Sequence, residues 1–202
     1  ELLPKLGQIR MVQANYSQYS SRYDKYLEGT VLPAFDPQLS GGALYDINIY
    51  NLNLIIGLFG APNNLIYQAR KGFNGIDTSG VVLMSYPEFQ ALAIGAKDSD
   101  SPSTCLIQGE KGWLKVETAP NQLEKIACQI RGEDNIQEYA LNQYPHRLSH
   151  EFAAFAAMLA NKDFAGRDLY LNISLQVAEA AEKSRKQADI SFLADQYLRS
   201  VP

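Results

Sequence analysis

Near the start of the chain, the spacing of apolar residues changes from the period of a strand to that of a helix. In residues 8–19, Val12 and Ala14 alternate with polar neighbours, which predicts a strand. In residues 43–59, apolar side chains recur at three- and four-residue steps before a run of glycine, alanine and proline, which predicts a helix. Residues 20–40 between them have no steady period, so we expect a long loop of the kind that often carries function.

The middle of the chain reads as a series of short strands. Apolar stretches of strand length are separated by turn signals such as Asn74-Gly75. Consecutive strands with short turns predict a largely antiparallel sheet. The predicted strands are residues 64–70, 80–86, 90–97, 104–108, 112–117 and 125–130.

Two helical patterns follow the strands, in residues 147–161 and 168–188. The first has Phe152, Phe155 and Leu159 on one face, and we expect both helices to cover one face of the sheet. The predicted fold is therefore α+β: an open, largely antiparallel sheet of about six strands with helices on one face.

The face of the predicted sheet opposite the helices must also be covered. Apolar residues such as Val82, Met84, Leu92 and Ile94 would leave it too hydrophobic for full solvation. We expect a homodimer that packs sheet against sheet through this open face.

Length and charge narrow the class of protein. The 202 residues, 46% of them hydrophobic, suffice for one domain over residues 1–202. The net charge of -4 and the lack of a basic cluster interleaved with aromatic residues argue against a nucleic-acid partner. No apolar run approaches the roughly 20 residues of a membrane span.

The cysteines and histidines predict no metal site. Cys105 and Cys128 lie in apolar stretches without CxxC spacing, so we expect two buried, reduced thiols and a cytoplasmic location. His146 and His150 have the i, i+4 spacing of metal ligands but lack a third ligand, which favours a solvated helix end. Neither GxGxxG nor GxxxxGK[ST] occurs, so we expect no nucleotide cofactor bound by these residues alone.

The most informative segment runs from Gly41 to Asn53. On a helix, Asp46, Tyr50 and Asn53 share one face, with Asp46 in the first turn. A phenol can donate a proton to a developing alkoxide, and a carboxylate one turn away can orient it or accept a substrate hydroxyl. The alternative is structural, because Asp is common in first turns and Tyr is common where helices meet sheets.

At these residues the sequence resembles the glucose-fructose oxidoreductase, inositol dehydrogenase and MocA family. The C-terminal domain of that family carries a segment like G-G-A-L-x-D-x-x-x-[HY], which here reads Gly41-Gly42-Ala43-Leu44, Asp46 and Tyr50, with Tyr where many relatives have His. The strand series and the two final helices also resemble the family's layout. The resemblance implies the family's C-terminal domain, which is like that of glyceraldehyde-3-phosphate dehydrogenase.

The resemblance also implies a partner domain and a reaction. In the family, an N-terminal Rossmann domain binds NAD or NADP, and a Lys from its Glu-Lys-Pro motif reaches a sugar, polyol or related hydroxy or keto substrate. Neither is in these 202 residues, so we expect a longer protein with the activity of an NAD(P)-dependent oxidoreductase and leave the activity of this chain open. The resemblance maps the family's pocket-lining Asp and His or Tyr to Asp46 and Tyr50, which we take as the catalytic candidates.

Smaller candidates lie in the long loop and along the helix. Arg22 and Tyr23, with Tyr26, could bind a polyhydroxylated ligand through hydrogen bonds and ring stacking, or the tyrosines could anchor the loop. We include Asn53, Arg22 and Tyr23 as candidate substrate-binding residues. The competing function is a non-catalytic relative that senses a ligand or acts as a scaffold and dimerises through its sheet.

Overall fold

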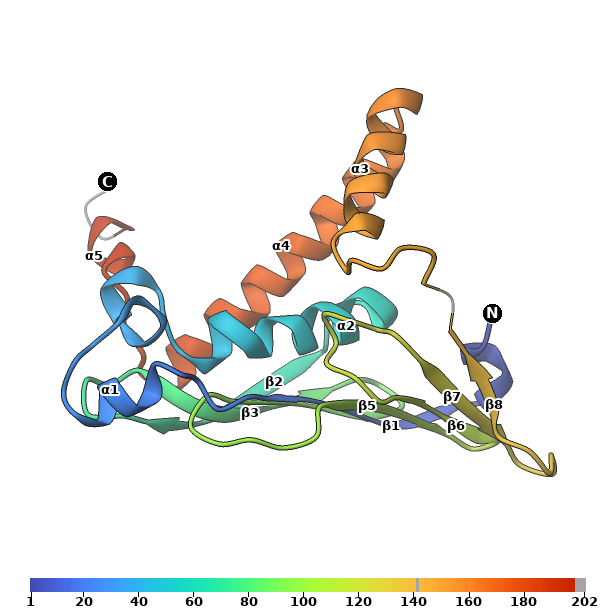
Figure 1. The fold of residues 1–202 in the computed structure, drawn as a ribbon, viewed down its shortest axis with the longest axis horizontal. Helices are drawn as coiled ribbons and strands as arrows, with labels where there is room; N and C mark the ends of the chain where they lie inside the picture. The colour runs from blue at the N-terminus through green and yellow to red at the C-terminus, as the bar shows by residue number, and fades with distance from the viewer. Residues whose placement is uncertain (141, 199–202) are drawn as a thin grey trace.

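The computed structural model of the chain describes residues 1–140 and 142–198. Most of these residues form one open sheet with the helices α2, α3 and α4 on one side of it (Figure 1). The predicted α+β class and the single helical side are confirmed. The sheet is formed by β1 (Ile9–Ser17), β2 (Asn64–Lys71), β3 (Asp77–Ser85), β4 (Gln90–Ala96), β5 (Thr104–Gly109), β6 (Gly112–Val116), β7 (Ile126–Ile130) and β8 (Gln137–Tyr139).

The sheet has eight strands where the sequence predicts about six. The seven segments with a strand pattern all form strands, and β8 is the addition. The pattern does not predict β8 because three residues are too few to show a period of two.

The strand order places β1, the first strand in the sequence, in the middle of the sheet between β4 and β5. The order is β2-β3-β4-β1-β5-β6-β7-β8, and every neighbouring pair is antiparallel except β1 and β4. In this parallel pair Ser17 is the partner of Ala96, so the carboxyl ends of β1 and β4 lie side by side. Residues that follow those two ends can therefore reach one site.

The helices are short except for α4. A π turn (Leu44–Asn48) leads directly into α2, and three 3-10 turns span Leu3–Leu6, Pro33–Phe35 and Pro37–Leu39. The α-helices are α1 (Tyr23–Leu27), α2 (Ile49–Phe59), α3 (Ser149–Asn161), α4 (Phe164–Gln187) and α5 (Ala194–Leu198).

Helix α2 forms the core with the middle of the sheet. Its Leu52 and Ile55 are fully buried, and so are Ala14 of β1 and Ala93 of β4 on the sheet beneath it. The small strand residues let the helix approach closely, and a Cβ on Gly95 would lie 2.6 Å from the Cβ of Asn48. This contact fixes the π turn over the ends of β1 and β4.

The prediction that both final helices cover the sheet is wrong for α3. No residue of α3 is buried, and Leu159 is 81% exposed. The cause is the course of α4: its C-terminal half packs on α2 and β2, burying Val177 and Ala181, while its N-terminal half rises away from the sheet (Figure 1). Because α3 packs on that rising half, it stands clear of the sheet.

The predicted open face of the sheet needs a second correction. Val82 and Met84 are fully buried and lie under the helices, because side chains alternate along a strand and their partners are Ala93 and Ala91. Leu83, which pairs with Leu92, points the other way and is 37% exposed. The open face is therefore apolar, but the residue that β3 contributes to it is Leu83 and not the predicted Val82 and Met84.

None of the helices in residues 1–140 and 142–198 is long and apolar enough to cross a membrane.

Candidate active site

A buried carboxylate fixes the start of the π turn. The backbone N–H of Leu44 donates to Asp77 Oδ2 at 2.6 Å, and the Tyr67 hydroxyl donates to the same oxygen at 2.7 Å. Gly42 has φ +106°, and a Cβ there would lie 2.1 Å from Asp77 Oδ1. Gly42 thus lets the backbone close onto Asp77, which is a structural role.

The pKa shifts of this pair reflect their burial. Desolvation raises the pKa of Asp77, and the Tyr67 hydroxyl, the Leu44 amide and the Lys97 charge oppose that rise. Burial, together with the neighbouring Asp77 carboxylate, raises the pKa of Tyr67 well above its ordinary range. Tyr67 is therefore a hydrogen-bond donor to Asp77 and not a group that ionises.

Asp46 projects from the π turn and forms an ion pair with a buried lysine. Lys97, the residue after β4, donates to Asp46 Oδ2 and, at 2.9 Å, to the Ala34 carbonyl. The Lys97 side chain is 3% exposed, whereas that of Asp46 is 51% exposed. The buried Lys97 thus holds one side of the Asp46 carboxylate, while the other side faces solvent. A π turn is a rare element that is often found at functional sites.

Tyr50 lies on the first turn of α2, over β1. Its ring contacts that of Tyr16, with centroids 5.9 Å apart, and it is 39% exposed. Tyr16 pairs with Gly95 across the parallel strands, two residues before Lys97. Asp46 and Tyr50 are therefore brought to the same end of β1 and β4, as their spacing predicts.

A cavity of about 380 Å³ opens beside Asp46. Asp46 contributes a carboxylate to it, Arg22 a guanidinium and Ser40 a hydroxyl, so it offers both donors and acceptors to a polyhydroxylated ligand. Burial raises the pKa of Tyr45, which also lines the cavity, and the Arg185 charge opposes that rise. The lining is formed by Arg22, Pro33, Ala34, Leu39, Ser40, Gly41, Tyr45 and Asp46.

Four of the residues singled out by sequence lie outside this lining. Tyr23 packs on Phe35 and on Tyr26, which is 1% exposed, so these tyrosines anchor the loop, as the structural alternative proposes. The Asn53 amide donates to the Ile49 carbonyl of its own helix at 2.8 Å. Tyr50 borders the site through Tyr16 and is not among the cavity residues.

Sequence reasoning misses Lys97 and Asp77. Lys97 ends an otherwise apolar strand segment, and Asp77 precedes the β-branched run of β3. A charged residue in phase with the buried positions of a strand is the available signal, since Ala91, Ala93 and Lys97 share one face.

The histidines and cysteines show ordinary surroundings. His146 Nδ1 accepts from the Leu148 N–H at 3.3 Å, and His150 Nε2 accepts from the Tyr144 N–H at 3.4 Å. Among the described residues no group of three or more metal-ligating side chains comes together. Cys105 and Cys128 are buried and unpaired, and burial raises the pKa of Cys105 to about 12, so it is no activated nucleophile.

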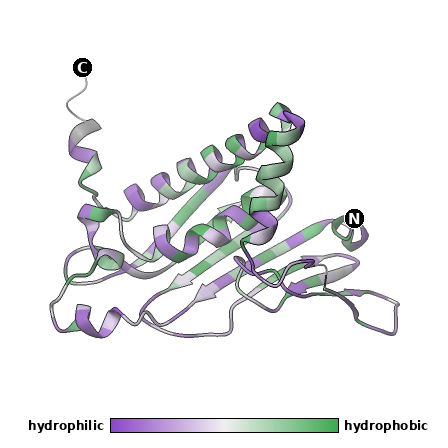
Figure 2. Cartoon of the chain, turned by 45° about the horizontal axis from the view of Figure 1, so that its top comes forward, coloured by the Kyte–Doolittle hydropathy of each residue, from purple (hydrophilic) through white to green (hydrophobic). Residues whose placement is uncertain are grey.

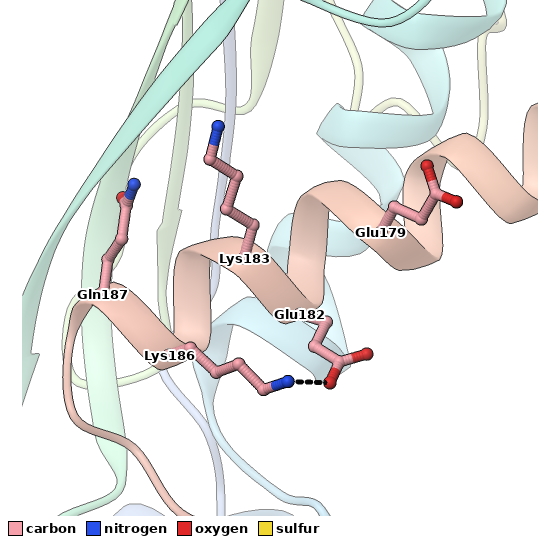
Figure 3. Close-up of a pocket in the computed structure, with 5 residues that line it drawn as sticks. All are labelled: Glu179, Glu182, Lys183, Lys186 and Gln187. Atoms are coloured by element: carbon pink, nitrogen blue, oxygen red, sulfur yellow. Dashed lines mark ion pairs between the residues drawn. The ribbon is translucent and has the colours of Figure 1, made fainter.

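A second hollow, on the surface of α4, lacks these features. Figure 3 shows its charged side chains along one helix, with Lys186 and Glu182 paired at 2.5 Å. Neither side chain of that pair is buried. We therefore place the site at Asp46 and not on α4.

The glycine pair before the π turn is the segment most like a phosphate cradle, yet the Leu44 N–H is already bonded to Asp77 and Gly42 is pressed against the same carboxylate. A buried acid at this position repels a pyrophosphate. This glycine pair therefore does not fit the nucleotide part of NAD(P).

Comparison with known protein families gives a match over more than half of the chain. Residues 4–115 match the model of the GFO/IDH/MocA C-terminal domain. Over 194 residues the chain is 34% identical to scyllo-inositol 2-dehydrogenase (NADP(+)) IolU of Bacillus subtilis, covering 96% of this chain and 58% of that protein.

Two solved structures share the fold. An inositol dehydrogenase homolog from Azotobacter vinelandii complexed with NAD+ superposes with a TM-score of 0.67 at 17% identity, over 92% of this chain and 57% of that one. KijD10, a 3-ketoreductase from Actinomadura kijaniata in complex with NADP and TDP-benzene, gives 0.69 at 18% identity, over 91% and 55%. The chain thus spans less than two thirds of the length of the proteins it resembles.

Proposed function

The chain belongs to the GFO/IDH/MocA family, whose C-terminal domain it matches, and from this premise we propose that it is the substrate-binding and dimerisation domain of an NAD(P)-dependent oxidoreductase. The substrate class is a sugar, a polyol or a related hydroxy or keto compound. The relative named as a scyllo-inositol dehydrogenase supports a polyol. Two unpaired cysteines are consistent with a reducing compartment such as the cytoplasm.

One observation carries this proposal. Asp46 presents a half-exposed carboxylate, held by a buried cation, to a cavity that also contains the Arg22 guanidinium. A carboxylate fixed in this way can accept a hydrogen bond from a substrate hydroxyl, and a guanidinium can donate to a neighbouring one. This is the chemistry that a polyol requires.

The chain's own groups divide the work of binding and proton transfer. Asp46 accepts the hydroxyl hydrogen of the substrate and orients that hydroxyl, and Arg22 binds a second oxygen. Tyr50 is exposed at the same end of the sheet, so in the direction of reduction its phenol can donate its proton to the developing alkoxide, and in the direction of oxidation the resulting phenolate takes the hydroxyl proton back. The Asn53 amide is bonded within its own helix and the Tyr23 ring packs on Phe35, so we narrow the substrate contacts in the cavity to Arg22 and Asp46, with Tyr50 at its border.

The nucleotide must then be bound outside these residues, and we propose an N-terminal Rossmann domain for that role. The α3–α4 surface supports such a neighbour, because it exposes a run of apolar side chains around a cavity of about 580 Å³ that includes Phe155, Leu159 and Phe164. An exposed apolar surface of this kind is typical of an interface.

For the open face of the sheet we propose a second copy of the chain. Ile66 and Leu83 are exposed there, next to Leu92. Leu83→Glu should place a charge in that interface and convert a dimer to a monomer in light scattering, whereas Leu27→Glu, on the exposed surface of α1, should not. A monomeric mass for the unaltered protein would contradict the proposal.

The test of function uses the full-length protein with NAD+ or NADP+ and a panel of polyols that includes inositols. Reduction of the nicotinamide is followed by its absorbance. Tyr50→Phe keeps the ring and removes the transferable proton, so the catalytic rate should fall on the order of 100- to 10,000-fold. Asp46→Asn should also lower the rate, and the double variant should fall by less than the product of the two effects.

The matched control is Tyr144→Phe, which removes a hydroxyl from an exposed tyrosine outside both cavities and should leave turnover unchanged. A Tyr50→Phe enzyme that is as active as this control would remove Tyr50 from the mechanism. No polyol-dependent reduction in the unaltered protein would reject the function itself.

A further inference from the structure

Lys97 occupies an unusual place for a lysine. Among the lysines in the part of the chain that the structure describes, it alone is buried. Taking an ammonium out of water carries a desolvation penalty, which a hydrophobic residue of similar length would avoid. A buried lysine is therefore poorly explained by stability alone.

The contacts of Lys97 join three parts of the candidate site. Its Nζ donates to Asp46 Oδ2 on the π turn and to the carbonyl of Ala34, which also lines the cavity. It also lies 4.6 Å from the centre of the buried Phe35 ring, which stabilises the cation from a third side. The ammonium therefore fixes the distance between Asp46 and the Ala34 wall.

This arrangement gives the two oxygens of Asp46 different roles. Oδ2 is bonded to Lys97, whereas no donor in the described residues bonds to Oδ1, and the carboxylate is half exposed. Two further charged groups are close: Arg22 lines the same cavity, and the charge of Lys97 acts on Asp77. Oδ1 is the oxygen that remains for a substrate hydroxyl.

We propose that Lys97 is a positioning residue for this site: it holds Asp46 so that Oδ1 faces the substrate, and it sets the Ala34 wall against which the substrate packs. This inference rests on the proposed function for its catalytic part. Its structural part, the fixing of Asp46 and of the Ala34 segment, does not depend on that function.

The test compares Lys97→Met with Lys115→Met in the full-length protein. Met fills the space of the lysine stem without its charge, and Lys115 is a control because its pair with Glu117 is exposed. Lys97→Met should lower the turnover rate on the order of 10- to 100-fold, the size expected when a reacting group is misplaced by about 1 Å. The KM for the dinucleotide should not change, and Lys97→Arg, which keeps the cation, should recover part of the rate.

A double-mutant cycle separates positioning from general damage. If Lys97 acts through Asp46, Lys97→Met should cause no further loss in an Asp46→Asn background. An equal loss in both backgrounds, or a Lys97→Met enzyme within twofold of the unaltered one, would overturn the proposal. If Lys97→Met does not fold, Lys97→Gln is put through the same cycle.

Amide hydrogen exchange supplies a readout that needs no turnover. Residues 33–36 and 42–47 should exchange faster in Lys97→Met than in Lys115→Met, because both segments lose their common partner. Unchanged exchange there would overturn the proposal. If the unaltered protein reduces no nicotinamide but this exchange does rise, the proposed function fails while the role of Lys97 in fixing Asp46 stands.

Discussion

Helices α2 and α3 have similar apolar patterns and opposite surroundings. Leu52 and Ile55 of α2 are fully buried against the sheet, whereas Phe152 and Leu159 of α3 are 68% and 81% exposed. Figure 2 shows apolar residues along the helices that stand clear of the sheet as well as in the body. A periodic pattern therefore identifies an apolar face but not what covers it.

The contrast between α2 and α3 should have its largest effect on the free energy of unfolding. Ile55→Ala leaves a cavity in a close-packed core, so the free energy of unfolding should fall by about 2–5 kcal/mol. Leu159→Ala removes the same kind of side chain from an exposed site and should change it by less than about 0.5 kcal/mol. Urea unfolding of the 202-residue chain measures both. Equal losses would mean that α3 is packed in solution and would break the comparison.

The two helices also differ at their starts. The π turn before α2 is bonded to the buried Asp77, whereas no side chain caps the first turn of α3. Tyr67→Phe leaves the Asp77 carboxylate short of a donor, which should cost about 1–3 kcal/mol in the free energy of unfolding. The exposed Tyr170→Phe is the control. A Tyr67→Phe chain as stable as that control would show that the Asp77 contact does not anchor α2.

The smallest expected effect is on the pH dependence of stability. It compares the two ends of α4, one of which is buried and the other exposed. Hydrogen bonds from Arg185, at its buried end, lower the pKa of Asp195 to about 2 from its ordinary value of 3.8. A lowered pKa means that the pair stabilises the fold above pH 3.8 and that this stability is lost as the pH falls toward 2. Unfolding followed between pH 5 and 2 should show this loss.

The matched change at the exposed end of α4 is Asp168→Asn, which removes a surface pair with Arg167. Surface pairs contribute little, so this variant should keep the pH dependence of the unaltered chain. Asp195→Asn should flatten that dependence below pH 4. A parallel response of both variants would mean that Asp195 is not held in solution.

Sequence reasoning recovers the sheet well because each strand has a period that burial enforces. The seven longer strands and α2 follow from local patterns. The parallel pairing of β1 with β4 does not, since it depends on which strand edges meet, and neither does the rise of α4 from the sheet. Both are decided by contacts between residues far apart in sequence.

The residues of the candidate site also fall into two groups: those that the local sequence predicts and those that only the fold reveals. Asp46 and Tyr50 follow from their helix spacing and from a family segment, and the structure places them at one end of the sheet. Lys97 and Asp77 are found only when the fold brings β3 and β4 under the π turn. A single charged residue in a strand gives no local sign of the partner it will meet.

The central place of β1 has a consequence for how the chain folds. Met11 pairs with Gln90 and Ile9 with Gly109. Both edges of the first strand therefore stay unpaired until segments much later in the chain have been synthesised. Such non-local pairing makes folding slow, since the entropy of closing long loops is lost before the contacts form. For the seconds that translation of the intervening residues takes, an apolar strand with two open edges is exposed to other chains. We expect this strand to be the segment that a chaperone must protect during synthesis.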